Sequence, residues 1–580
     1  MLLTLLPVEL LIEILSQVSR SDLKRLCEVS KLFNKLATPI LYRSVLIKAE
    51  SEVSLEESLD TKLLNITCCH SENVLCFTRD FQITSSFHDL THKRCSRNWD
   101  FNDYYSGEFQ NEDGDILMGK LEQTIIHFLE KLEDGQLRNF SWELGTCIPE
   151  QLLSSYNGQL QAKQNKIESI WLVMDGSCYT HDFVGAPDLT SFQNLKCLSL
   201  IGLNWFYFES LWGTFNGISD QLQELELDFV DWQAIDYDPD SPENYFAEEA
   251  LGMSRKDKIC IFPSLKVLLL SRVPFQPFQR AMAYAFGFTH LQSLRLQLCP
   301  GWEGFLAHIQ CLNLQIHLKM LEVQHTVNCE DSMGEGEQLL TFLHAFDGLE
   351  ELFVSTSGPS SAVDLWCAAL KHGATLKRFI HHQRTVNIDD ELVYFEEECN
   401  LPDLLFGPEG INQLSQDPSW NLLVSLDLEC LGMCCIPSYL KHLLAPCTAK
   451  CLLKVLHIRG SGSDTLKYKS LIIQRDKYIN NGKECSKVTT KLHHFAEWIF
   501  RPEGFPSMKV LAAGDFSHDG WYLKTNVILC WREVSDPPET ISGRFYRYAK
   551  ESDVGVWLLL ETYSSALAAC PTDSILEYGA

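Results

Sequence analysis

A short apolar motif recurs along most of this chain and restricts what the chain can fold into. The motif is an apolar residue, two variable residues, an apolar residue, one variable residue and a final apolar residue, as in Leu195–Leu200 (LKCLSL). In an extended strand, successive side chains point to opposite faces, so the apolar positions face one way and the variable positions the other. One such strand cannot bury its leucines alone, and stacked copies must supply the core.

The copies of this motif start at a nearly constant spacing. Their first residues are Leu137, Ile167, Leu195, Leu222, Leu265, Leu291, Leu318, Leu349, Leu376, Leu423, Leu453 and, more weakly, Met508. Most neighbours are roughly 26–31 residues apart, close to the period of leucine-rich repeats, which carry the same LxxLxL pattern. Phe278–Phe286 and Gln338–Phe346, between copies, have helical apolar spacing. A leucine-rich chain could produce single motifs by chance, but not this many near one period. We therefore expect an α/β repeat fold, a curved solenoid with short parallel strands inside and helices outside.

The repeat period breaks in three places. Asp231–Lys258 and Asp389–Ser419 are acid-rich, and Ser461–Lys491 fills the third gap. Insertions into a repeat array map to loops on one face. The Asp, Glu, Pro and Ser content of the first insertion, with its weak apolar pattern, predicts a mobile loop.

The N-terminal forty residues have the apolar spacing of short helices. Pro7 suits the first turn of a helix, Val8 to Leu15 carry two apolar stripes, Ser21 and Asp22 predict the start of a second helix, and Pro39 predicts the end of a third. Chains below about 40 residues usually need a staple or a partner to be stable. A helical partner is therefore expected, although these residues could also form the core of an N-terminal bundle.

The same stretch resembles the F-box, in the order LP-x-EL, IL, DL-x-x-L-x-x-V and F-x-x-LA over residues 4–45. The resemblance implies docking onto the Skp-type adaptor of a cullin–RING ubiquitin ligase, with Leu10, Ile14 and Leu15 at the centre of the contact. The residues that it assigns to adaptor binding are Leu6, Pro7, Glu9, Leu10, Ile14, Leu15, Leu23, Leu26, Val29 and Phe33.

At the level of architecture, an F-box followed by degenerate leucine-rich repeats is similar to a broad group of F-box proteins of filamentous fungi. Gly504–Leu511 and Gly514–Ser517 resemble the terminal repeats of that group. The expected organisation is an F-box over 1–47, a connecting segment with irregular early repeats and a polar loop over 48–135, a solenoid over 136–530 and a C-terminal cap over 531–580.

Composition argues against several classes of partner. The 580 residues contain 48 Lys and Arg against 77 Asp and Glu, a formal net charge of −29, and no dense basic run that a nucleic acid would need. We expect no membrane span, because the apolar run Val556–Leu560 is short and meets Glu561. A cytoplasmic or nuclear address follows, with the 22 cysteines as reduced thiols.

No catalytic residue, cofactor or metal is expected. The glycine loop Arg459–Asp464 follows a strand but lacks the GK[ST] ending of a phosphate loop. The set closest to a metal cluster is Cys430, Cys434, Cys435, Cys447 and Cys451, with His442 and His457 nearby. Zinc sites prefer shorter, paired spacings, so buried thiols are the better interpretation.

The expected function is that of a substrate receptor, which holds a target near the ubiquitin carrier and raises its effective concentration. Variable positions of the repeat strands would bind the target, and the assigned residues are Glu224, Glu226, Gln292, Arg295, Gln297, Glu429 and Arg459. Two alternatives remain at this level: a non-degradative scaffold that binds the Skp-type adaptor without cullin, and a repeat-borne enzyme.

Overall fold

The computed structural model describes most of the helices and strands of the chain. The described residues are 6–49, 72–85, 112–149, 151–153, 158–174, 189–203, 207–229, 246–324, 335–357, 362–384, 421–435, 437–448, 452–459, 473–480, 483–517, 526–532, 545–550 and 552–571. The chain divides into two compact units, Met1–Leu265 and Lys266–Tyr578, which are considered separately.

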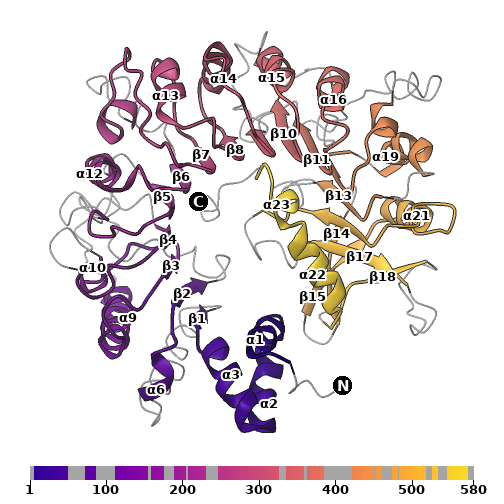
Figure 1. Cartoon of the computed structure of the whole chain (residues 1–580). Coiled ribbons are helices and arrows are strands. Elements are labelled where there is room, and N and C mark those ends of the chain that lie inside the picture. The colour runs from indigo at the N-terminus through magenta and orange to yellow at the C-terminus, as the bar shows by residue number, and fades with distance from the viewer. Residues whose placement is uncertain are drawn as a thin grey trace. The chain divides into compact units, whose positions relative to one another are not determined.

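The first unit begins with three helices and continues as a parallel sheet (Figure 1). The strands pair in chain order, and they are β1 (Ser44–Ala49), β2 (Asp80–Ser85), β3 (Asn139–Glu143), β4 (Ser169–Val173), β5 (Cys197–Leu203) and β6 (Glu224–Phe229). Between them lie α6 (Glu72–Leu75), α9 (Glu112–Lys131), α10 (Gln159–Lys163), α12 (Phe208–Ile218) and the π-helical turn η5 (Phe246–Ala250). Phe128 of α9 stacks on Phe81 of β2, which places that helix on the apolar face of the sheet.

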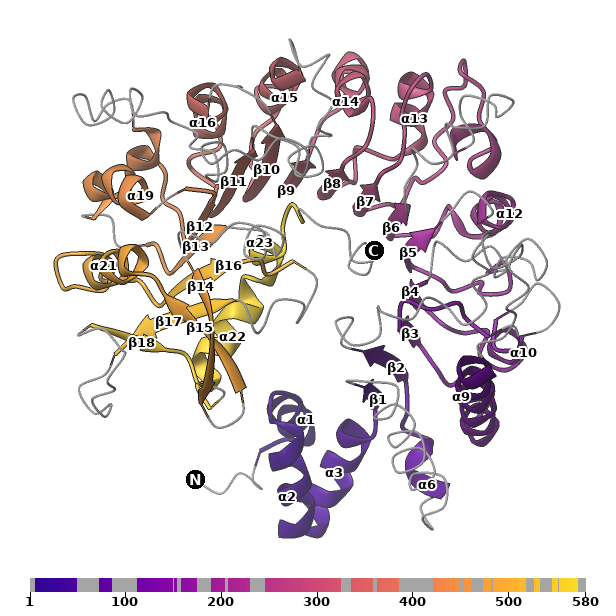
Figure 2. The same ribbon diagram turned by 180° about the vertical axis from the view of Figure 1, so that it is seen from behind.

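The second unit repeats this arrangement and then changes at its end (Figure 2). Its parallel strands are β7 (Val267–Ser271), β8 (Ser293–Gln297), β9 (Met320–Gln324), β10 (Glu351–Ser357), β11 (Arg378–Arg384), β12 (Cys430–Met433), β13 (Val455–Arg459) and β16 (Val510–Gly514). β17 (Val527–Trp531) and β18 (Tyr546–Tyr548) then add antiparallel, while β14 (Ile473–Asn480) and β15 (Lys483–Val488) form a separate hairpin.

Helices cover both faces of the second sheet, but they come from different parts of the chain. The helices between the strands are α13 (Gln279–Ala285), α14 (Trp302–Cys311), α15 (Glu335–Leu343), α16 (Ala362–Leu370), α19 (Pro437–Leu444) and α21 (Thr490–Ile499), with the 3₁₀ turns η7 (Leu422–Ser425) and η8 (Ala445–Cys447). The opposite face is covered by α22 (Val554–Thr562) and α23 (Ser564–Leu567), which follow the last strand.

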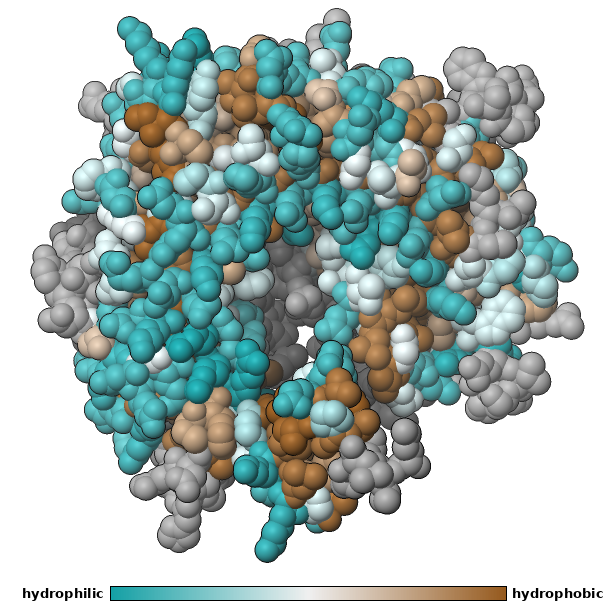
Figure 3. Space-filling model, viewed as in Figure 1, coloured by the Kyte–Doolittle hydropathy of each residue, from teal (hydrophilic) through white to brown (hydrophobic). Residues whose placement is uncertain are grey.

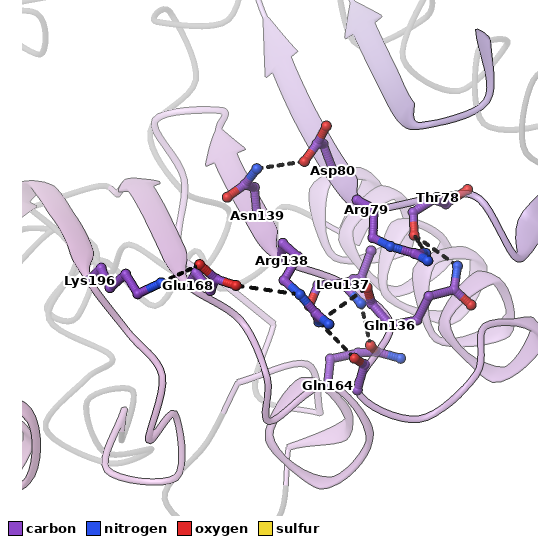
Figure 4. Close-up of polar contacts among 11 residues, drawn as sticks. Thr78, Arg79, Asp80, Gln136, Leu137, Arg138, Asn139, Gln164, Glu168 and Lys196 are labelled. Carbon is purple, nitrogen blue, oxygen red and sulfur yellow. Dashed lines mark hydrogen bonds and ion pairs between the residues drawn. The ribbon is translucent and has the colours of Figure 1, made fainter. Parts of the chain in front are cut away.

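A repeated backbone hydrogen-bond pattern joins neighbouring repeats in both units. The carbonyl group of the residue after the first anchor accepts two consecutive N–H groups of the next repeat, as when Lys319 O accepts from Glu350 and Glu351. Side chains of the residues that follow the first anchors also meet in the first unit (Figure 4): Glu168 lies 3.5 Å from Arg138 and 2.7 Å from Lys196. The Lys196 hydrogen bond holds the pKa of Glu168 below its usual value. Within each unit, this recurring geometry makes each strand continue the stack of the one before it.

Most of the expected strands are confirmed, since a strand starts two residues or so after each predicted first anchor from Leu137 to Leu376, and again after Leu453 and Met508. The anchor at Leu423 is wrong: residues 422–425 form η7, and the strand is Cys430–Met433. The sequence holds two overlapping matches, and Leu428, not Leu423, occupies the anchor position, because Glu429 and Cys430 donate to Lys377 O. Helices predicted at Phe278–Phe286 and Gln338–Phe346 are confirmed as α13 and α15.

Three predicted loops need correction. The polar loop of the connecting segment, expected over Ser85–Gly119 from its Asp, Asn, His and Ser content, ends earlier, because α9 already begins at Glu112. The insertion Ser461–Lys491 contains the hairpin of β14 and β15 and the first residues of α21. Within the first acidic insertion, Phe246, Ala247 and Ala250 are buried, and Phe246 packs edge-on against Phe208 and Phe229. In the described part of that insertion, 246–258, the apolar residues up to Met253 therefore belong to the core, because η5 packs on α12. The rest of this insertion, and all of 389–419, lie outside the described residues.

Candidate docking surfaces

The three N-terminal helices form a small bundle: α1 (Val8–Ser16), α2 (Arg20–Val29) and α3 (Lys31–Leu41). The Ser19 hydroxyl accepts the Asp22 N–H at 3.2 Å, so α2 begins at Arg20, slightly before the predicted Ser21. The Ser30 hydroxyl caps α3 in the same way, accepting the Phe33 N–H. Such caps satisfy backbone donors that would otherwise be unpaired. Pro39 does not end α3, because a proline in the last turn removes only its own N–H donor and the helix continues to Leu41.

The bundle core is small, and α1 leaves apolar side chains in solvent. Leu11, Leu15, Leu23, Phe33 and Ala37 form the core. The exposed large apolar side chains are Val8, Leu10, Ile12, Ile14, Val29 and Leu32. Figure 3 shows the resulting apolar surface over this part of the first unit. Contiguous exposed apolar surface on a soluble domain marks an interaction site more often than a defect.

The residues assigned to adaptor binding fall into two groups. Leu10 (47% exposed), Ile14 (44%) and Val29 (68%) are accessible, as are Pro7 and Glu9, while Leu6 and Leu26 are half-buried. Leu15, Leu23 and Phe33 lie in the interior of the bundle. These three residues hold the helices together from inside, and in the chain by itself they present no surface to a partner.

The variable positions of the first sheet form a polar face with one aromatic side chain. Strand register places Gln82, Ser141, Trp171, Ser199 and Glu226 side by side in one row across β2 to β6. Trp171 is 46% exposed, and the Ser199 hydroxyl donates to Glu226 at 2.6 Å. Of the residues assigned to target binding, Glu224 is exposed and Glu226 half-buried on this face.

Trp171 was missed in the sequence, although a signal was present. It occupies the variable position between the last two anchors of its motif, where the neighbouring repeats carry Ser141 and Ser199. A large aromatic side chain at a variable position has no place in the shared core, and this alone marks it as a surface residue.

On the corresponding face of the second sheet, the part formed by β9 to β13 and β16 carries an apolar cluster and is covered. Residues 553–571, called here the C-terminal segment, contribute Leu560, Tyr563, Ala566, Leu567, Ala569 and Cys570 to one buried cluster. From the strands, the cluster contains Met320, Phe353, Ile380, Cys430, Val455, Val510 and Ala512. These strand residues sit at the variable positions of their motifs, opposite the leucines that face the other helices.

Polar contacts fix the end of the C-terminal segment on the strands. Arg459 donates to the carbonyl groups of Ala569 and Cys570, the second at 3.1 Å. The Cys570 N–H donates to Glu322 at 2.8 Å, and Gln324 donates to the Pro571 carbonyl group at 2.6 Å. Because these partners are far apart in the sequence, the contacts depend on the completed stack of strands.

Two further contacts hold the middle of this segment. The Tyr563 hydroxyl donates to Glu429 at 2.8 Å, and Arg378, paired with Glu351 at 2.8 Å, also donates to the Ser565 hydroxyl. Hydrogen bonds from Lys454 and then Tyr563 lower the pKa of Glu429. Glu429 is therefore an ionised acceptor at neutral pH.

The remaining residues assigned to target binding lie in this unit, and they differ in how far they are buried and bonded within the chain. Gln292 is exposed. Arg295 is half-buried, 3.9 Å from Glu322, and Gln297 donates to Glu322 at 2.6 Å. Glu429 is half-buried beside Tyr563, and Arg459 is only 4% exposed beneath the C-terminal segment. The sequence placed all of them on one face but could not show that part of this face is covered.

The cysteine-rich stretch that came closest to a metal cluster in the sequence contributes mainly buried side chains. Within the described residues, no group of three or more His, Cys, Asp or Glu side chains is placed to hold a metal ion. Cys430, Cys434, Cys435 and Cys447 are buried thiols, and Cys451 lies outside the described residues. Burial raises the pKa of Cys430 to about 12, so this thiol is protonated and a poor nucleophile.

Comparison with known families identifies the N-terminal bundle. An F-box-like family model matches residues 3–48, which span α1 to α3 and nearly all of β1. The chain therefore carries an F-box-like domain, the class of domain that docks substrate receptors onto the adaptor of Skp–cullin–F-box ligases. No curated protein matches the sequence. In the part of the chain that the structure describes, no helix is long and apolar enough to cross a membrane.

Proposed function

We propose that this protein is a substrate-recognition subunit of a Skp–cullin–F-box ubiquitin ligase. The observation that carries the proposal is the F-box-like domain with an exposed apolar stripe on α1, at Leu10 and Ile14 among others. A bundle with five buried core residues is small, so a partner that covers this stripe would stabilise it. The Skp-type adaptor is the proposed partner, and cullin and the RING protein would join through it.

The repeats would supply the target-binding surface, and we keep their assignment as leucine-rich repeats and the division at 47, 135 and 530 as part of the proposal. In this role the protein does no chemistry of its own. Holding the target beside the ubiquitin carrier replaces a bimolecular encounter by an intramolecular one. The open polar face around Trp171, with Glu224 and Glu226, is the target surface most readily reached; the assigned residues of the second unit would add to it.

Acidic composition fits a protein target better than a nucleic acid. The formal net charge is −29, and a nucleic-acid binder needs a basic face. We place the protein in the cytoplasm or nucleus, where the buried cysteines described above would stay reduced.

The test is adaptor capture by full-length variants. Replacing both Leu10 and Ile14 by alanine should weaken capture of the Skp-type adaptor about tenfold or more, because each side chain would bury apolar surface worth roughly 1.5–3 kcal/mol. The matched control is Leu314→Ala, an exposed leucine in the second unit, which should leave capture unchanged. The double change Leu6→Ala with Pro7→Ala, at the edge of the stripe, should act in the same direction. Unchanged capture by a folded Leu10/Ile14 variant would contradict the proposal.

Cullin in the captured complex separates the two main interpretations. Its presence with the adaptor supports a ligase receptor. Adaptor without cullin would instead support the non-degradative scaffold.

A further inference from the structure

We propose that the covered face of the second unit is a recognition surface for a short apolar helical segment followed by a polar, non-helical end, and that the C-terminal segment is its resident, displaceable occupant. This inference rests on the proposed function, because the competing ligand would be a segment of the target protein. The surface consists of the variable positions of β9 to β13 and β16.

The occupant is an interrupted helix followed by a non-helical end. Leu560 lies in the last turn of α22, Tyr563 between α22 and α23, and Leu567 at the end of α23, and all three are buried against the strands. Helical segments bind apolar grooves through buried anchors of this kind. Cys570, also buried, follows outside the helices. The opposite side of α22 remains in solvent, since Leu558 is 57% exposed. A peptide with the same anchor pattern would fit the same strand positions.

The polar end of the site indicates that the resident segment is not its best ligand. Arg459 Nη1, Glu322 Oε2 and Gln324 Oε1 are buried and have no hydrogen-bond partner among the described residues. Glu322 is 0% exposed, and Arg459 and Gln324 are 4% exposed. Buried polar atoms without partners weaken a complex, because they lost water and gained no bond.

These atoms also define what a stronger ligand would carry. Arg459 needs one more acceptor, such as a carboxylate or a carbonyl group, and Glu322 and Gln324 each need a donor. All three lie where the backbone of residues 569–571 crosses the strands. A target whose helix is followed by a polar segment would satisfy them and displace the resident segment.

The segment is an addition to a sheet that is already complete. β17 and β18 end the sheet antiparallel before α22 begins. The other face of the strands has its own core, which includes Leu321, Leu352 and Leu456 and packs against the helices between the repeats. Removal of the segment would expose the apolar strand residues but would leave this core and the strand pairing in place.

The test uses full-length protein and a labelled peptide of residues 552–571 as the probe. Ala566→Arg changes only the resident segment, at a side chain that is 0% exposed, and should loosen it. The Ala566→Arg variant should bind the wild-type peptide at least about tenfold more tightly than the unchanged protein does. Leu558→Arg, on the exposed side of α22, is the matched control and should bind no better than wild type. A peptide of the same composition in scrambled order should not bind.

Two results would overturn the proposal. One is an Ala566→Arg variant that melts close to wild type yet does not bind the peptide. The other is hydrogen exchange of wild-type protein in which amides of Leu560–Leu567 open only together with those of β11 and β13, since this would make the segment an inseparable part of the core. Earlier opening of the segment supports the proposal even if the variant does not fold.

A parallel measurement of adaptor capture distinguishes failure of this inference from failure of the proposed function. Adaptor capture would depend on residues 3–48, outside the second unit. Peptide binding with no adaptor capture would retain the surface and reject the ligase role, and adaptor capture with no peptide binding would do the reverse.

Discussion

The two units use the same strand motif but differ on the face opposite the helices between the repeats. In the first unit the variable positions include Ser141, Trp171 and Glu226, and the face is polar, with Trp171 exposed. In the second they include Phe353 and Ile380, and the face is covered by the C-terminal segment. The leucine anchors specify the stack in both units. The residues between them decide whether the second face is a surface or another core.

This difference separates strand residues that stabilise the fold from strand residues that are accessible to a partner. A polar face can lose or change a side chain at little cost, because water replaces the lost contacts. An apolar face needs a permanent or exchangeable cover, since burying apolar surface contributes about 25 cal/mol per Å². The predictions below test the comparison, from the largest expected effect to the smallest.

Phe353→Asp should destabilise the second unit by several kcal/mol, because it buries a charge among Ile380 and Tyr563 neighbours in the apolar cluster. Chemical denaturation measures the loss. Trp171→Asp, at the exposed variable position of the first unit, is the control and should change the free energy of unfolding by less than about 1 kcal/mol. Equal losses would contradict the distinction between the two faces.

The second unit should lose stability in mild acid. Burial lowers the pKa of His381 to about 3, and burial with the nearby Arg459 charge lowers that of His457 to about 3. Below pH 6.5 the unfolded chain takes up protons that the folded chain does not. Stability is therefore complete above about pH 6.5 and falls towards pH 3, by up to about 1.4 kcal/mol per pH unit for each histidine.

Denaturation at pH 7, 6 and 5 checks this slope. Burial also lowers the pKa of His372. His457→Gln removes one of these three rings and should reduce the slope by up to about 1.4 kcal/mol per pH unit, while it keeps a donor for the Gly514 carbonyl group, which His457 contacts at 2.9 Å. In the first unit the only described histidine is His127, which is exposed, so hydrogen-exchange protection factors there, corrected for the intrinsic pH dependence of exchange, should change little over the same range. A slope that His457→Gln does not alter would refute the assignment.

Arg459→Met should weaken the docking of the C-terminal segment by about 1.5–3 kcal/mol, the range for hydrogen bonds to charged groups. The variant loses the bonds to Ala569 and Cys570 but keeps an apolar stem. Faster hydrogen exchange over residues 560–570, with β7 and β8 unchanged, is the expected readout. Lys441→Met, a change of charge on α19 of the same unit, should leave those amides unaffected.

Trp171→Ala should have the smallest effect on folding and a clear effect on target capture. The side chain is 46% exposed, so its loss should cost less than about 1 kcal/mol. If the polar face of the first unit binds the target, capture of ubiquitinated partners should fall, while adaptor capture stays the same. Trp212→Ala, a similarly exposed tryptophan on α12, is the control, and equal losses from both would argue against a specific role for the strand face.

Much of the architecture could be predicted from local patterns. The N-terminal helices follow from apolar spacing. The strands β1, β2, β14, β15, β17 and β18 correspond to none of the predicted anchors, while the other strands follow from the LxxLxL anchors. The exception is β12, where two overlapping matches compete and only pairing with Lys377 selects Leu428. In the candidate adaptor site, the motif residues all fall within the F-box-like match, but local pattern did not separate exposed Leu10 and Ile14 from buried Leu15.

The sequence by itself determined the elements, because helix caps, apolar period and strand alternation act over a few residues. Only the tertiary structure decided which faces are open. Arg459 meets Ala569, and Glu322 meets Cys570, across more than a hundred residues of intervening chain. Such contacts exist only after the repeats have stacked and brought the variable positions of distant strands into one surface. For that reason the apolar run Val556–Leu560 was interpreted from the sequence only as too short for a membrane span, whereas in the folded protein it lies in α22, in the segment that covers part of the second face.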